Sequence, residues 1–172
     1  LPPKEQQSQL AELLWAMDDV IEKEVKVQSG LEIIRLSLMK KFQVGGEDWL
    51  KCKIKNLMNF KYGKALKETE RIPGDYSVVS SAGIQGTHEE YIVNSPGIVV
   101  GRKGNAGEVT WVEKNFWPID TAYYIEAKKH KTNIPMKFLY YLLQAANLQK
   151  YSISTAVPGL NRDDAMATNI YL

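Results

Sequence analysis

Apolar residues recur at alternating spacings of three and four near the start of the chain. This alternation is typical of a coiled-coil seam, so we predict one long helix from about Glu5 to Lys41, roughly 55 Å long at 1.5 Å per residue. Pro2 and Pro3 suit its first turn. Only Glu24 interrupts the seam, whose apolar members are Leu10, Leu13, Met17, Val20, Val27, Leu31, Ile34 and Leu38.

This apolar seam predicts a packing partner. A long helix gains most of its stability by burying its apolar stripe, and no comparable periodic segment follows in the sequence. We therefore expect a second helix, from another copy of the chain in a possible homodimer or from another protein. The alternative is a core helix within one globule.

The pattern changes at Gly45-Gly46, which divides the chain into the helix, residues 1–44, and a mixed α/β domain, residues 45–172. Residues 49–57 alternate as in a half-buried strand, with Leu50, Cys52 and Ile54 on the inner face. One main helix is predicted at 135–149, with Asn133 as its cap. Because βαβ alternation is missing, the fold class is α+β, with many short strands. The other predicted strands are 76–79, 91–94, 98–102, 109–112 and 121–126.

Charge is distributed unevenly between these segments. Residues 1–42 carry 6 basic and 7 acidic side chains, whereas the rest carries 16 and 13. Residues 51–67 contain six lysines and no acid, interleaved with Asn56, Asn59 and Tyr62. Such a face suits a sugar-phosphate backbone, although charge alone favours the alternative of a solvated strand face.

Composition excludes several classes of protein. The single cysteine, Cys52, cannot form an internal disulfide, and with two histidines it cannot complete a four-ligand zinc site. No apolar run approaches the roughly 20 residues of a membrane span, and no signal segment opens the chain. We expect a soluble protein of the reducing cytoplasm, without a membrane partner.

Two segments resemble enzyme motifs but lack their chemistry. The glycines of 101–107 precede a predicted strand rather than a helix, so they form neither a dinucleotide nor a phosphate loop. They predict a tight turn that brings basic side chains toward an anion. Asp120 and Glu126 would lie roughly 20 Å apart on one strand, too far to share a metal. We expect no catalytic residue, no metal and no cofactor in this chain, with a small metal-dependent nuclease as an alternative.

Several ordered sequence blocks resemble the target-recognition domains of type I restriction-modification specificity subunits. The blocks are residues 62–64 (YGK), 74–86 (GDYSVVSSAGIQG), 100–107 (VGRKGNAG), 116–122 (FWPIDTA) and 157–164 (VPGLNRDD), with 1–6 (LPPKEQ) as the start of the helix. Together they cover nearly the whole chain. In this family a recognition domain leads directly into the next long helix, and the two ends of this chain look like the two sides of that junction. The resemblance therefore implies one half of such a subunit: a long conserved helix plus one target-recognition domain.

The resemblance implies a function in DNA recognition. This chain would read one half of a bipartite double-stranded DNA target without catalysing a reaction. Methyltransferase subunits would supply S-adenosylmethionine and flip an adenine, a separate restriction motor subunit would cut, and the helices would set the spacing between half-sites. Within the chain, side chains with base- or phosphate-binding groups are the candidates: Tyr62, Lys64, Gln85, Thr87, His88, Arg102, Lys103, Asn105, Trp117 and Arg162.

A second hypothesis is an assembly protein that uses the helix for oligomerisation and binds no DNA. Salt discriminates the two, because phosphate contacts weaken steeply with ionic strength whereas an apolar protein interface responds little.

Overall fold

The computed structural model describes residues 1–128, 134–153 and 158–172 and divides into two compact units, Leu1–Lys40 and Lys41–Leu172. Asn133 and Val157, which belong to the predicted helix cap and the last sequence block, lie outside the described residues. Within the described residues, no helix has the length and apolarity that a bilayer crossing needs.

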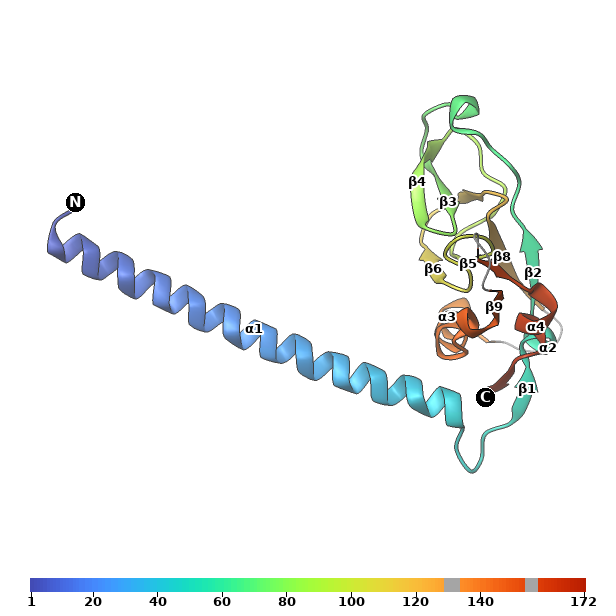
Figure 1. The fold of residues 1–172 in the computed structure, drawn as a ribbon, viewed down its shortest axis with the longest axis horizontal. Helices are drawn as coiled ribbons and strands as arrows, with labels where there is room; N and C mark the ends of the chain where they lie inside the picture. Colours follow the sequence, from blue (N-terminus) through green and yellow to red (C-terminus); the bar gives the residue numbers. More distant parts are fainter. Residues whose placement is uncertain (129–133, 154–157) are drawn as a thin grey trace. The chain divides into compact units, whose positions relative to one another are not determined.

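The long helix is confirmed as α1, Lys4–Val44 (Figure 1). It contains no buried residue. Ion pairs one turn apart stabilise its polar face, for example Lys23 with Asp19 and Lys26 with Glu22, both at 2.6 Å. Every apolar residue of the predicted seam is more than half exposed. The seam therefore lies uncovered in the single chain, and its partner helix stays a prediction.

A four-stranded antiparallel sheet forms the centre of the second unit (Figure 1). Its order is β2 (Met58–Tyr62), β8 (Ala122–Ala127), β5 (Gly97–Gly101) and β6 (Val109–Val112). Helix α3, Met136–Ala145, contacts β5 and β6 and buries Leu139, Leu142 and Leu143. All five residues of β5 are buried, since strands flank it on both sides and α3 covers one face. This core holds the ends of β2, β5 and β8 in fixed register.

A second sheet has the order β4 (Gly83–His88), β3 (Tyr76–Ser80) and β7 (Phe116–Pro118). Strand β3 pairs antiparallel with β4 and parallel with β7. A small core of Val79, Val99 and Phe116 with its neighbours joins this sheet to β5.

Two short antiparallel pairs complete the unit: β1 (Lys51–Lys53) with β11 (Asn169–Tyr171), and β9 (Ser152–Ile153) with β10 (Gly159–Leu160). The remaining turns are helical: α2 (Ile54–Leu57), α4 (Arg162–Ala167) and the 3₁₀ turns η1 (Glu68–Glu70) and η2 (Leu148–Tyr151). The fold is thus the predicted α+β class, with many short strands and one main helix in the domain.

The predicted strand over 49–57 is wrong beyond Lys53. Strand β1 ends there and α2 begins, because Ile54 and Leu57, three positions apart, both enter the core on one helical turn. Leu50, expected inside, is 75% exposed, while Cys52 packs half-buried against the core, where burial raises the pKa of its thiol. The lysines at 51, 53 and 55 consequently do not share one strand face.

Other element boundaries also differ from the sequence prediction. Residues 91–94 form no strand beyond one bridge between Val93 and Phe116. Strands β2, β4 and β7 were not predicted. Helix α3 ends at Ala145 rather than at Gln149, and Pro135 occupies its cap position.

Candidate nucleic-acid interface

An open pocket of about 350 Å³ brings together basic and aromatic residues that the sequence analysis had singled out. We call it the basic pocket; it is lined by Tyr62, Arg102, Lys103, Tyr123, Gly159, Leu160 and Asn161. Arg162 lies beside it, with its guanidinium over the Tyr62 ring. Four of the ten predicted DNA-contacting residues therefore meet at one place: Tyr62, Arg102, Lys103 and Arg162.

The ends of neighbouring strands position these residues. Tyr62, the last residue of β2, pairs with Tyr123 of β8. Arg102 follows β5; its backbone N–H donates to the Thr121 carbonyl and its own carbonyl accepts from the Leu160 N–H. The next residue, Lys103, is held by an antiparallel β-bridge with Gly159. Segments distant in sequence thus converge through backbone pairing.

Gly101 is required by the tight turn that follows β5. A Cβ there would lie 1.9 Å from the Asn105 carbonyl oxygen, closer than any side chain tolerates. The turn is further closed by hydrogen bonds from the Gly107 N–H to the Gly101 carbonyl and from the Gly104 N–H to the Pro158 carbonyl. The predicted glycine turn is therefore present, and it directs Arg102 and Lys103 toward the basic pocket.

Two guanidiniums stack on the Tyr62 ring. The Arg102 and Arg162 guanidinium carbons lie 4.9 Å and 5.3 Å from the ring centroid. Arg102 also donates from Nη1 to the Asp120 carbonyl oxygen at 2.9 Å. Arg162 is the first residue of α4, whose N-cap Asn161 accepts hydrogen bonds from the backbone N–H groups of Asp163 and Asp164. Such stacking fixes the guanidinium planes while leaving the charges in place.

The electrostatics of the basic pocket favour an anion. Arg102, Lys103 and Arg162 supply positive charge, and the nearest carboxylate contact is Asp163 Oδ1, 3.5 Å from Arg162 Nε. Burial raises the pKa of Tyr123, whose hydroxyl donates to the Leu160 carbonyl at 3.4 Å, so this phenol stays neutral. Arginine and lysine donors beside an aromatic face are the groups that bind nucleic-acid backbones and base edges.

His88 and Trp117, both predicted to contact DNA, are buried inside the fold. Trp117 is 5% exposed and donates from Nε1 to the Lys64 carbonyl. His88 is 6% exposed; its Nδ1 accepts from the Ile72 N–H and its ring packs edge-on against Trp117. The structure thus places both side chains as packing supports for β3, β4 and β7, away from solvent. Only the Lys64 ammonium, 5.3 Å from the Trp117 ring centroid, is exposed in this group.

Gln85 and Thr87 lie on β4, an edge strand, rather than in a loop. Both are exposed. Thr87 Oγ1 accepts weakly from the Gly74 N–H at 3.4 Å, and the Gln85 carbonyl accepts from Arg71 Nη1. Asn105, in the turn after β5, is also exposed and donates to the Glu108 carboxylate at 3.0 Å. None of these three lines the basic pocket, and their DNA contacts remain predictions.

Sequence reasoning missed four lining residues: Tyr123, Gly159, Leu160 and Asn161. Tyr123 sits in a predicted strand, where a buried aromatic carries no functional signal. Asn161 had a readable signal, because an Asn followed by acidic residues in the first turn is a typical helix start. The helix α4 was not predicted, so its cap was overlooked.

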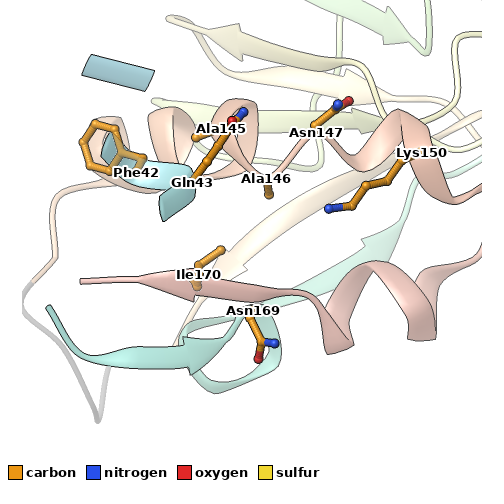
Figure 2. A pocket seen from close by; sticks show the side chains of 8 residues that line it. All are labelled: Phe42, Gln43, Ala145, Ala146, Asn147, Lys150, Asn169 and Ile170. Atoms are coloured by element: carbon orange, nitrogen blue, oxygen red, sulfur yellow. The ribbon is translucent and has the colours of Figure 1, made fainter. Parts of the chain in front are cut away.

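A second hollow, of about 200 Å³, has a different character (Figure 2). Carboxamides and apolar side chains, among them Phe42 and Ile170, line it, with Lys150 as its one charged lining residue. It has no arginine. Lys150 is therefore a matched control for charge changes in the basic pocket. Among the residues that the structure describes, no group of three or more His, Cys, Asp or Glu side chains lies close enough to bind a metal ion.

Comparison with known families decides what this arrangement belongs to. Residues 46–172 match the family model described as the type I restriction modification DNA specificity domain. The chain belongs to this family. The match begins directly after α1 and includes both sheets, so the basic pocket lies within the specificity domain itself.

Solved structures show the same fold. A crystal structure of the type I restriction-modification system S subunit from M. genitalium superimposes with a TM-score of 0.66 at 21% identity, over 77% of this chain and 36% of that one. The HsdS subunit from Thermoanaerobacter tengcongensis gives 0.64 at 12% identity, over 100% of this chain and 47% of that one. A structure addressing complex assembly and conformational transition of the type I R-M system gives 0.59 at 11%, over 100% and 48%. This specificity domain with its helix thus spans about half or less of each of those chains, and no curated sequence matches it.

Proposed function

We propose that this chain reads one half of a bipartite double-stranded DNA target and that the basic pocket is part of the reading surface. The observation that carries the proposal is the convergence of Arg102, Lys103 and Arg162 around Tyr62 in a domain of the DNA specificity family. Cations positioned on a rigid scaffold bind phosphates and, where they reach a groove, base edges.

In this proposal the chain performs recognition and no catalysis. Methyltransferase subunits bind the chain and supply S-adenosylmethionine, and the restriction motor subunit joins through them. The match to the DNA specificity family and the likeness in fold to a chain of a type I R-M system whose complex assembly was addressed are consistent with this proposal. The exposed seam of α1 then packs on a second helix, from another half of a subunit or from another copy of the chain, and so sets the distance between two half-sites.

Salt dependence of binding tests the proposal. The chain is reconstituted with its methyltransferase partner, and its affinity for duplex DNA is measured by fluorescence anisotropy over a series of salt concentrations. The logarithm of the binding constant should fall linearly with the logarithm of salt concentration, and Lys103→Ala should reduce the slope by about 1 if this lysine binds one phosphate.

Lys150→Ala, in the hollow of Figure 2, is the control and should leave the slope unchanged. A binding constant that does not respond to salt, or a slope that Lys150→Ala lowers as much as Lys103→Ala, would contradict the assignment of the basic pocket. The assembly-protein hypothesis predicts the first of these results, because an apolar interface releases no counterions.

A further inference from the structure

Of the basic groups around the basic pocket, Arg102 is held most rigidly. Its main chain is fixed on both sides, by the hydrogen bonds to Thr121 and from Leu160. Its guanidinium is fixed twice more, by the Asp120 carbonyl at 2.9 Å and by the Tyr62 ring at 4.9 Å. A side chain ordered in this way has already lost most of the rotamer freedom that binding would otherwise remove.

The contacts that hold Arg102 leave its charge and one edge available. The Asp120 contact uses Nη1 and a backbone carbonyl, which does not neutralise the guanidinium. Among the described residues Arg102 forms no ion pair, in contrast to Arg162 with Asp163. The other polar group beside the guanidinium is the Tyr123 hydroxyl, which interacts with it. The edge formed by Nε and Nη2 has two parallel N–H donors, which is the geometry that a bidentate contact needs.

Lys103 and Arg162 differ from Arg102 in ways that matter for base reading. Lys103 is exposed and presents an ammonium on a flexible stem, which suits a phosphate but cannot form a planar two-donor contact. Arg162 packs over the same Tyr62 ring, and Asp163 offsets part of its charge. Arg162 is therefore the less suited of the two arginines to a base contact.

We infer that Arg102 is the residue that reads a guanine in the major groove, through the O6 and N7 acceptors of that base. This inference rests on the proposed function. Guanine presents two adjacent acceptors there, which match the two N–H donors of a guanidinium, and no other base does so. The Tyr62 stack and the Asp120 carbonyl orient these donors before DNA arrives.

Base analogues test the inference without altering the protein. The methylated motif is first mapped in cells that express the complex, and a duplex carrying that motif is synthesised with 7-deazaguanine at each guanine of the half-site in turn. This analogue lacks the N7 acceptor and keeps Watson–Crick pairing. At one guanine the wild-type complex should bind at least about tenfold more weakly. Inosine at the same position removes only the minor-groove amino group and should leave affinity nearly unchanged.

Titrating the same duplexes with protein variants assigns the contact to Arg102. The Arg102→Lys complex, which keeps the charge but lacks the planar two-donor edge, should no longer distinguish guanine from 7-deazaguanine at that position. Lys103→Ala should weaken every duplex alike and remain sensitive to the analogue. Arg102→Lys that stays as sensitive as the wild type would overturn the inference, as would a half-site in which no guanine responds. If the Arg102→Lys variant does not fold, the wild-type complex still tests whether any guanine of the half-site responds to 7-deazaguanine. Failure of the proposed function itself gives a different result, because the complex would then bind motif and scrambled duplexes equally.

Discussion

Tyr62 links the cations of the candidate interface. Its ring contacts the guanidiniums of Arg102 and Arg162 on the outside and the Tyr123 ring, 5.2 Å between centroids, toward the core. At 51% exposure, part of the ring lies at the surface, where both guanidiniums contact it. We therefore expect the ring to order the two arginines in addition to packing on Tyr123.

Two replacements of Tyr62 distinguish the contribution of the ring to DNA affinity from that of the hydroxyl. Tyr62→Leu should lower DNA affinity by about 1 kcal/mol, roughly fivefold, because each cation–π contact contributes about 0.5–1 kcal/mol at an exposed site. Tyr62→Phe keeps the ring and should bind nearly as the wild type does. Anisotropy titrations of the two variants in the reconstituted complex provide the measurement. Equal losses for both would assign the effect to the hydroxyl instead.

Gly101 should be intolerant of any side chain. Because a Cβ there meets the Asn105 carbonyl at 1.9 Å, Gly101→Ala forces the turn to open and should reduce the free energy of unfolding by at least about 2 kcal/mol. Gly159→Ala is the control, since its nearest neighbour lies at 3.8 Å. Thermal denaturation followed by circular dichroism compares them. If both alanines lower the melting temperature equally, the close approach at Gly101 is not the cause.

At the scale of elements, α4 depends on its cap. Asn161 Oδ1 accepts from the Asp163 and Asp164 N–H groups at 2.9 Å and 3.3 Å, and α4 has only six residues. Asn161→Ala should destabilise the domain by about 1 kcal/mol, whereas Asn161→Ser or Asn161→Asp should preserve most of the stability. Urea unfolding reports these changes. An alanine variant as stable as the aspartate variant would mean that packing alone holds α4.

The α1 seam makes a separate prediction. Val20→Asp places a charge in the exposed apolar row and should abolish association with a second helix, while Ser29→Asp, outside that row, should not. Sedimentation velocity of the chain, alone and with its methyltransferase partner, measures the association. If Val20→Asp assembles like the wild type, the seam is not the interface.

The regular elements were the most predictable from sequence. The α1 helix follows from the spacing of its apolar residues, and the strands at 76–80, 97–101, 109–112 and 122–127 follow from short apolar and β-branched runs bounded by turn residues. The short elements were not predictable. Residues 54–57 continue an alternating pattern and yet form a helical turn, because tertiary packing of Ile54 and Leu57 outweighs a local preference over four residues.

The candidate interface was predictable in residue type but not in grouping. Glycine spacing indicated that Arg102 and Lys103 occupy a turn, and charge indicated Arg162. Their meeting at Tyr62 depends on the pairing of β2 with β8 and on the 160–162 segment, and such long-range register cannot be inferred from local sequence. His88 was chosen for its chemistry; its burial against Trp117 follows from the β3–β4 pairing.

For the whole molecule, the two units divide the proposed work. The helix carries an apolar row and charged i,i+4 pairs, and the domain carries the excess of basic side chains. In the proposed function, recognition resides in the domain, which folds around its own core, and spacing resides in the helix, whose apolar row would pack on a second helix. Because the excess of basic side chains is confined to the domain, the net charge of +2 for the whole chain gives little indication of a DNA partner.

The most direct test of the account maps adenine methylation across the genome of cells that carry the complete system, with and without this chain. The account predicts a bipartite motif that is methylated only when the chain is present, and one half of that motif should lose its sequence preference in cells that carry Arg102→Ala together with Lys103→Ala. A methylation pattern that is the same with the wild-type chain, with the double variant and without the chain would contradict the claim that this domain reads DNA.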